Sequence, residues 1–171
     1  MCRIFYTFVD ISDAFAPKRK HKICSHAAYG LLKKCALKCG FDVSDFEIIR
    51  NEHGKPYLKN SEFFFNISHS DDFVCLVISD REVGIDTQRV GDVNPDVVKR
   101  FLKKESLGEL ENTYLWTDYE AIGKYFGVGI PHSIELVPSI AIDHFRVGDF
   151  CISLCREFED VPHAPETISV K

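Results

Sequence analysis

The spacing of apolar residues divides the first half of the chain into a strand, a long helix and several short strands. Ile4, Tyr6 and Phe8 alternate in the manner of a strand. From about residue 20 to residue 39 the apolar residues recur at helical spacing, and Gly40 ends the predicted helix. Extended segments are expected at 46–50, 63–67, 73–79 and 83–86, with turn chemistry at 54–56.

The second half repeats this order of helices followed by antiparallel strands. Helices are expected at 94–101 and 113–126, and a hairpin at 140–145 and 150–155 about Gly148 and Asp149. The shared order predicts an α+β fold of two small units, residues 1–82 and 83–171. From about residue 159 the chain is polar and contains two prolines, which predicts a loose tail.

Composition narrows the class of protein. The chain has 171 residues, is 45% hydrophobic and contains 14 Phe, so it can bury a core of its own. Its formal net charge of -5 gives no general attraction to nucleic acid or to an anionic membrane. No apolar run approaches the roughly eighteen residues of a membrane span, and the N-terminus lacks the layout of a signal peptide. We therefore expect a cytoplasmic protein with no nucleic-acid or membrane partner.

The most informative local feature is an acid and a base one helical turn apart. Glu120 and Lys124 fall on one face of the helix expected around Trp116 to Gly127. A carboxylate can hold a metal ion or accept a proton, and an ammonium can hold a phosphate. The same spacing also describes an ordinary surface salt bridge, which is worth only tenths of a kcal/mol.

Three further segments carry polar side chains at the ends of expected strands. Residues 66–70, Asn-Ile-Ser-His-Ser, offer hydroxyls and an imidazole to an anion, or they merely shape a turn. Lys55 stands in the constrained turn Gly54-Lys55-Pro56, where an exposed lysine is also common. Asp86 ends the strand that contains Gly84 and Ile85, where it either caps the following loop or binds a cation. Together with Glu120 it would be a sufficient protein contribution to a Mg²⁺ site.

Taken in order, these motifs resemble the 4'-phosphopantetheinyl transferase superfamily, in its Sfp-like branch. The resemblance extends from about residue 18 to residue 129. It includes Gly54-Lys55-Pro56, residues 65–70, residues 83–86, Arg100-Phe101 and residues 116–127. It implies a fold of two similar α/β halves with pseudo-twofold symmetry around a cleft, formed within a monomer.

The resemblance also implies an activity and assigns residues to it. Such enzymes transfer the 4'-phosphopantetheine group of coenzyme A to a serine of an apo acyl or peptidyl carrier protein, as in holo-[acyl-carrier-protein] synthase activity. Adenosine 3',5'-bisphosphate is released, and Mg²⁺ is required. By position, the metal ligands would be Asp86, Glu120 and Gln88, and the contacts to coenzyme A would be Lys55, Ser68, His69, Lys124, Lys20 and Lys22. Glu120 would take the serine proton, and Lys124 would neutralise or protonate the leaving phosphate.

Three departures from the family pattern keep a second interpretation open. Gln88 stands where many relatives have a second acid, Tyr119 replaces a lysine beside Glu120, and an arginine common in the first helix is absent around residues 25–28. A catalytically weak or inactive homologue that binds coenzyme A or a carrier protein is therefore the alternative. A third interpretation is an unrelated domain in which these motifs are structural. An acidic carrier would need a basic strip, for which Lys33, Lys34, Lys38, Lys103 and Lys104 are candidates.

Overall fold

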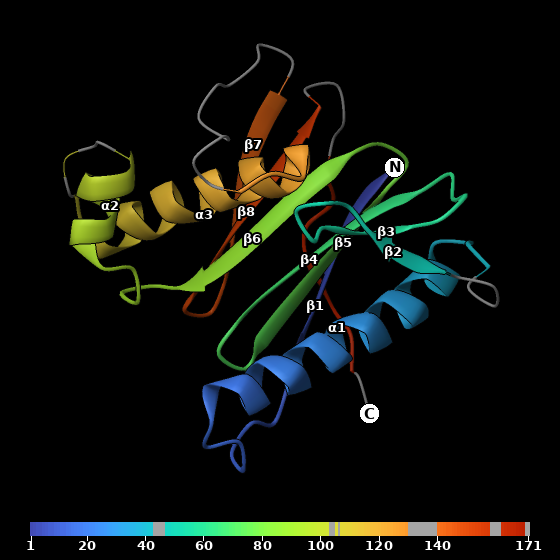
Figure 1. The fold of residues 1–171 in the computed structure, drawn as a ribbon, viewed down its shortest axis with the longest axis horizontal. Helices are drawn as coiled ribbons and strands as arrows, with labels where there is room; N and C mark the ends of the chain where they lie inside the picture. Colours follow the sequence, from blue (N-terminus) through green and yellow to red (C-terminus); the bar gives the residue numbers. More distant parts are fainter. Residues whose placement is uncertain (43–46, 103–104, 106, 130–139, 158–161, 170–171) are drawn as a thin grey trace.

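The protein has a mixed α/β fold in which the predicted elements occur in the predicted order. The computed structural model describes residues 1–42, 47–102, 105, 107–129, 140–157 and 162–169. Lys103, Lys104 and the expected strand start at residue 46 lie outside this part. The elements are β1 (Cys2–Phe8), α1 (Pro17–Lys38), β2 (Ile48–Arg50), β3 (Pro56–Leu58), β4 (Phe64–Ser70), β5 (Phe73–Ser79), β6 (Val83–Arg89), α2 (Pro95–Leu102), α3 (Glu109–Phe126), β7 (Ile140–Val147), β8 (Phe150–Glu157) and β9 (Glu166–Thr167) (Figure 1).

Two larger sheets each carry one long helix. The first sheet has the strand order β4-β5-β1-β9, and the second has the order β6-β8-β7. Helix α1 packs on β1, β4 and β5, whereas α3 packs on β6 and β8 (Figure 1). The hairpin β2-β3 lies beside β4. None of the helices in the described ranges is long and apolar enough to cross a membrane.

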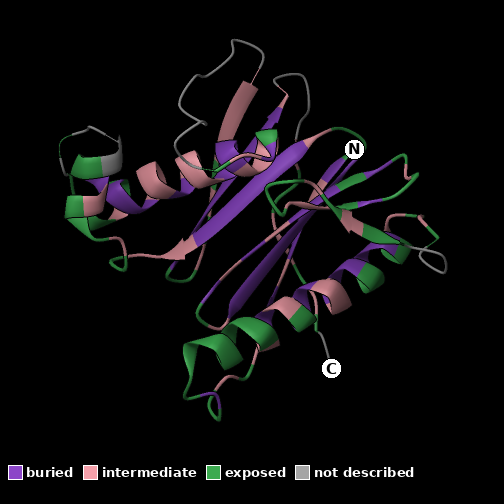
Figure 2. Cartoon of the chain, in the orientation of Figure 1, coloured by how far each residue is buried: buried purple, intermediate pink, exposed green. Residues whose placement is uncertain are grey.

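Strand β5 is the centre of the core. All seven of its residues are buried, as expected for its continuous apolar sequence (Figure 2). On one face Leu76 and Ile78 pack with residues of α1, and on the other Cys75 and Val77 pack with residues of β6 and β8. Each fully buried aliphatic side chain of this kind contributes about 1.5–3 kcal/mol. The core therefore continues from α1 through β5 to the second sheet.

Within the stretch expected to be a loose tail, Glu166 and Thr167 form a short strand, so the expectation does not hold for these two residues. Strand β9 runs parallel to β1, with Glu166 opposite Phe5. The Glu166 carboxylate accepts hydrogen bonds from Arg3 Nη2 at 2.7 Å and Lys38 Nζ at 2.8 Å. The segment docks because it covers an open strand edge and because its acid meets two cations. The division of the chain at residue 82 stays a prediction.

Candidate active site

At the base of the site, β4 and β6 are joined by hydrogen bonds that involve side chains of β4. Every second residue of the Asn-Ile-Ser-His-Ser segment accepts a hydrogen bond from a backbone N–H of β6. These bonds run from Ile85 N to Asn66 Oδ1 (3.0 Å), from Thr87 N to Ser68 Oγ (3.3 Å) and from Arg89 N to Ser70 Oγ (3.3 Å). Because side chains on one face of a strand recur every two residues, the three acceptors match the three donors in register. The segment therefore joins the two sheets at the base of the site.

The backbone of strand β6 also packs directly against the backbone of α3. A Cβ atom added at Gly84 would lie 2.1 Å from the Ala121 carbonyl oxygen and 2.4 Å from the Tyr125 nitrogen. Only glycine permits this packing, because any side chain would push the helix away. The helix then ends at Gly127, whose φ of 68° is in the left-handed region that suits glycine. This close contact places the last turn of α3 against Asp86.

Lys124 pairs with Asp86 rather than with its helical neighbour Glu120. Its Nζ donates to Asp86 Oδ1 at 2.6 Å and lies 2.9 Å from Ser68 Oγ. Ser68 Oγ donates to the same oxygen of Asp86 at 2.7 Å. Glu120 and Lys124 form no ion pair with each other in this part of the structure. The interpretation of these two residues as a surface salt bridge is therefore wrong, and Asp86 is the anion that Lys124 neutralises.

Glu120 and His69 both have shifted pKa values because of burial. Burial raises the pKa of the Glu120 carboxyl, the negative charge of Asp86 raises it further, and Lys124 opposes both effects. Burial lowers the pKa of the His69 imidazole, and its electrostatic interactions with His21 and Lys124 lower it further, against the opposing effect of Asp86. The site therefore holds a carboxylate that favours a cation or a proton, beside an imidazole that favours its neutral form.

These side chains line one cleft of about 400 Å³. Of the predicted site residues, the cleft brings together Ser68, His69, Asp86, Gln88, Glu120 and Lys124. It also contains residues that the sequence had not singled out as ligands, namely His21, Ser25, Tyr29, Arg50 and Trp116. The residues of α1 had a signal, since positions 21, 25 and 29 share one helical face. Arg50 had none, because nothing local indicates where the short strand β2 lies.

The two lysines predicted from the basic run lie outside this cleft. Lys20 lines a separate depression with Asp10, Asp71 and Asp72. Lys22 lines a depression on α1 that shares His21 and other α1 residues with the cleft. Successive helical residues point in directions about 100° apart, so Lys20, His21 and Lys22 face different surroundings. The histidine, rather than either lysine, faces the cleft.

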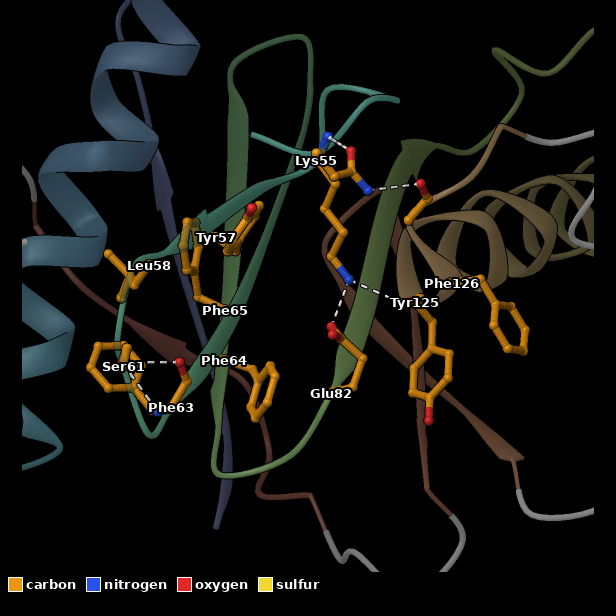
Figure 3. Close-up of a pocket in the computed structure, with 12 residues that line it drawn as sticks. Lys55, Tyr57, Leu58, Ser61, Phe63, Phe64, Phe65, Glu82, Tyr125 and Phe126 are labelled. Carbon is orange, nitrogen blue, oxygen red and sulfur yellow. Dashed lines mark hydrogen bonds and ion pairs between the residues drawn. The ribbon is translucent and has the colours of Figure 1, made fainter. Parts of the chain in front are cut away.

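Lys55 is also absent from the cleft lining and holds other elements together. Its Nζ donates to Glu82 Oε1 at 2.6 Å and to the Tyr125 carbonyl oxygen at 3.1 Å (Figure 3). It lies in a neighbouring pocket of about 190 Å³, half of whose lining residues are aromatic, whereas the next residue, Pro56, lines the cleft. The predicted phosphate contact of Lys55 is therefore not supported by this arrangement, in which its ammonium ties the start of β6 to the end of α3.

Comparison with known proteins shows which family the chain resembles. Residues 14–81 match the family described as "4'-phosphopantetheinyl transferase, N-terminal". The chain is 36% identical over 72 residues to the 4'-phosphopantetheinyl transferase gsp of Aneurinibacillus migulanus, covering 42% of this chain and 27% of that protein. It is 29% identical over 117 residues to the 4'-phosphopantetheinyl transferase Sfp of Bacillus subtilis (strain 168), covering 62% and 49%. The chain is a relative of the Sfp-like 4'-phosphopantetheinyl transferases.

A longer but weaker match extends this relationship to both halves of the chain. The L-aminoadipate-semialdehyde dehydrogenase-phosphopantetheinyl transferase of Saccharomyces cerevisiae (strain ATCC 204508 / S288c) is 26% identical over 167 residues, covering 85% of this chain and 61% of that protein. The chain thus spans between 27% and 61% of the length of these three phosphopantetheinyl transferases.

The donor set of this Sfp-like relative fits a magnesium ion. Asp86 and Glu120 offer carboxylate oxygens and Gln88 an amide oxygen, all toward the same cleft. Hydrogen bonds from the described residues occupy Asp86 Oδ1 and leave Oδ2 for a cation. Mg²⁺ typically takes one or two carboxylates and fills its remaining positions with water and substrate phosphates. No cluster of three His, Cys, Asp or Glu residues that could hold a metal occurs in the described ranges.

Proposed function

We propose that this protein transfers the 4'-phosphopantetheine group of coenzyme A to a serine of an apo acyl or peptidyl carrier protein. The products are the holo carrier and adenosine 3',5'-bisphosphate, as in holo-[acyl-carrier-protein] synthase activity. The observation that carries the proposal is the partly buried contact of Lys124 with Asp86, in a cleft that also contains Glu120, in a relative of phosphopantetheinyl transferases.

The reaction requires one bond to form and one to break at phosphorus. The serine oxygen attacks the β-phosphate of coenzyme A in line, and the bond to the adenosine bisphosphate oxygen breaks. Asp86, Glu120 and Gln88 would hold Mg²⁺, which would supply positive charge to the pyrophosphate. Lys124 stands beside these ligands as a further cation, fixed in position by its two hydrogen bonds.

Glu120 is the residue best placed to receive the serine proton. It lines the cleft on the same face of α3 as Lys124, and its partial burial strengthens it as a base. The proton passes to its carboxylate directly or through a water molecule. Lys124, one turn further along, neutralises or protonates the leaving phosphate.

Mass spectrometry of carrier proteins tests this function. The purified protein is incubated with Mg²⁺, coenzyme A and apo carriers of fatty-acid, polyketide and peptide-synthetase types. We expect at least one carrier to gain the mass of the phosphopantetheine arm, and omission of Mg²⁺ to prevent the gain. If no carrier is modified although coenzyme A binds, the transferase proposal fails and the alternative of a binding homologue replaces it.

Gln88 is the specific observation that favours the alternative. It lies in the cleft with Asp86 and Glu120, so one oxygen ligand of the proposed metal site is neutral. We expect Gln88→Glu to lower the Mg²⁺ concentration needed for half-maximal transfer, and Gln88→Ala to raise it, because a carboxylate binds Mg²⁺ more strongly than an amide. An unchanged Mg²⁺ dependence in both variants would remove Gln88 from the metal site.

The wider organisation is also part of the proposal. We propose two similar halves with pseudo-twofold symmetry, divided near residue 82, and a cytoplasmic monomer that contains the whole cleft. Residues from α1, β4, β6 and α3 all reach the cleft within one chain, which supports this assembly. Light scattering after size-exclusion chromatography at several protein concentrations tests it, and a concentration-dependent dimer would contradict it.

A further inference from the structure

The turn between β2 and β3 is held in one shape by its own hydrogen bonds. Asn51 Oδ1 accepts hydrogen bonds from the backbone N–H groups of His53 and Lys55, at 3.0 and 2.9 Å. The Gly54 N–H donates to the Asn51 carbonyl oxygen at 2.9 Å, and the Asn51 N–H donates to the Lys55 carbonyl oxygen at 3.1 Å. An asparagine that bonds to the backbone following it stabilises a turn. Residues 51–55, which we call the β2-β3 turn, are therefore a rigid unit.

The β2-β3 turn donates two hydrogen bonds to the end of α3. Lys55 Nζ donates to the Tyr125 carbonyl oxygen at 3.1 Å (Figure 3), and Asn51 Nδ2 donates to the Gly127 carbonyl oxygen at 3.0 Å. The last carbonyl groups of a helix have no partner within the helix, so they need donors from elsewhere. The ammonium group of Lys55 also opposes the negative end of the helix dipole. The turn therefore caps α3 from positions 70 and 76 residues earlier in the sequence.

The capped turn of α3 is also the turn that directs Lys124 to Asp86. Lys124 directly precedes Tyr125, and its Nζ donates to Asp86 Oδ1 at 2.6 Å. The Lys55 side chain is only 12% exposed, so its bond to the helix is largely shielded from water. The end of a helix frays when its carbonyl groups lose their partners. Without the cap, Lys124 would lie on a frayed turn and would no longer have one fixed orientation.

We infer that Asn51 and Lys55 are positioning residues, which hold the last turn of α3 so that Lys124 meets the reacting phosphate at a fixed place. The inference rests on the proposed function, because it takes phosphoryl transfer as the reaction that Lys124 assists. A misplacement of about 1 Å, caused by a change far from the chemistry, can slow an enzyme about a hundredfold. Lys55 thus acts through Lys124, and not through the direct phosphate contact that its motif predicts.

Steady-state kinetics of carrier modification tests this role. Asn51→Asp keeps an Oδ acceptor for the turn, removes the donor to Gly127 and places a negative charge at the negative end of the helix. Lys55→Met keeps most of the length of the side chain and removes the donor to Tyr125. We measure kcat and the KM for coenzyme A at saturating Mg²⁺, with the carrier that the wild type modifies fastest. Urea unfolding measures the stability of each variant.

Two matched controls change the same kinds of group without removing the cap. Asn94→Asp makes the same substitution outside the cleft lining, where Asn94 Oδ1 accepts a hydrogen bond from the Asp96 N–H. Glu82→Gln removes the ion-pair partner of Lys55, whose Oε1 lies 2.6 Å from Nζ, and leaves the donor to Tyr125 in place. Lys55→Arg is the conservative replacement, because it retains a cation with several N–H donors.

We expect Asn51→Asp and Lys55→Met to lower kcat about tenfold or more and to change the KM for coenzyme A less than about threefold. Asn94→Asp and Glu82→Gln should keep the wild-type kcat, and Lys55→Arg should recover part of the rate that Lys55→Met loses. A merely structural role would lower the stability of the variants without lowering kcat for the molecules that remain folded in the assay.

The results that would overturn the inference are distinguishable from failure of the proposed function. With an active wild type, an unchanged kcat in both Asn51→Asp and Lys55→Met would exclude a positioning role and leave the transferase proposal intact. A raised KM at unchanged kcat in Lys55→Met would give Lys55 a direct substrate contact instead. A kcat in Glu82→Gln as low as in Lys55→Met would assign the effect to the ion pair and not to the cap. A wild type that modifies no carrier would overturn the transferase proposal and this inference together.

Discussion

At the scale of single residues, packing rather than spacing decides which charges meet. Glu120 and Lys124 are one turn apart on α3, but Lys124 reaches across to Asp86, because β6 lies against the helix at Gly84. Asp86 is 6% exposed and receives two hydrogen bonds on one oxygen. The sequence places Glu120 and Lys124 on one helical face, but it does not show which carboxylate forms the ion pair with Lys124.

Removal of either proposed metal carboxylate should abolish transfer and leave the fold intact. We expect Glu120→Gln and Asp86→Ala to reduce the rate of carrier modification by at least about a hundredfold. Glu120→Gln should unfold at the same or a higher temperature than the wild type, since burial already disfavours the ionised form. In Asp86→Ala the Lys124 side chain, 29% exposed, can still reach water.

The matched control for these variants is Glu109→Gln, which changes an acid in the first turn of the same helix, outside the cleft lining. It should modify carriers at the wild-type rate. Wild-type rates in both Glu120→Gln and Asp86→Ala would show that the site has been assigned to the wrong residues.

The structure accounts for two of the three departures from the family pattern and not for the third. The helix that lacks the expected arginine instead contributes Tyr29, whose hydroxyl accepts a hydrogen bond from Arg50 of β2. Gln88 lines the cleft, so its substitution for an acid bears directly on the site. Tyr119 is half-buried on α3 and is not among the residues that line the cleft, so nothing in the site explains it.

At the scale of elements, the strands and helices follow from the sequence, but their junctions do not. The continuous apolar run at residues 73–79 and the turn at Gly148 locate β5 and the β7-β8 hairpin to within a few residues. The bonds from β6 to the side chains of residues 66–70 join positions 19 residues apart, and no local sequence pattern indicates that these two segments lie side by side. The same polar residues had favoured anion binding or turn formation, because their geometry as acceptors depends on where β6 lies.

The contact between β6 and α3 predicts a strong effect of adding one methyl group. Gly84→Ala should lower the free energy of unfolding by about 1–3 kcal/mol or more, because the new Cβ meets helix backbone that cannot move aside alone. Urea unfolding measures the change. Gly108→Ala is the control, since there the Cβ meets the end of the flexible Glu111 side chain, and its effect should be small. Equal stabilities of Gly84→Ala and wild type would show that the helix can be displaced at no cost.

At the scale of the whole molecule, a strand from the C-terminal part of the chain pairs with the first strand. Strand β9 pairs with β1, and Glu166 meets Arg3 and Lys38. The polar composition after residue 159 predicted the opposite, because a two-residue parallel strand leaves no periodic signal. Ion pairs between residues so far apart in the sequence can be identified only when the position of the sheet edge is known.

This docking should depend on pH in one direction. Hydrogen bonds from Lys38 and Arg3 lower the pKa of Glu166 below its ordinary value. The stabilisation is therefore fully present above the pKa of an unfolded glutamate and is lost as the pH falls through the lowered value. The difference in unfolding free energy between wild type and Glu166→Gln should be largest near neutral pH and shrink below about pH 4. A difference that does not change with pH would contradict a role for the ionised carboxylate.

The junction between β4 and β6 should divide the amides of β6 into two alternating classes. The N–H groups of Ile85, Thr87 and Arg89 donate to side-chain oxygens of β4, whereas the alternation of an antiparallel pair directs the intervening N–H groups to the backbone of β8. In amide exchange followed by NMR, Ser68→Ala should accelerate exchange at Thr87 and leave Asp86 unchanged. The hydrogen bonds between β4 and β6 at the base of the cleft would then break independently of one another, while the pairing of β6 with β8 stays intact.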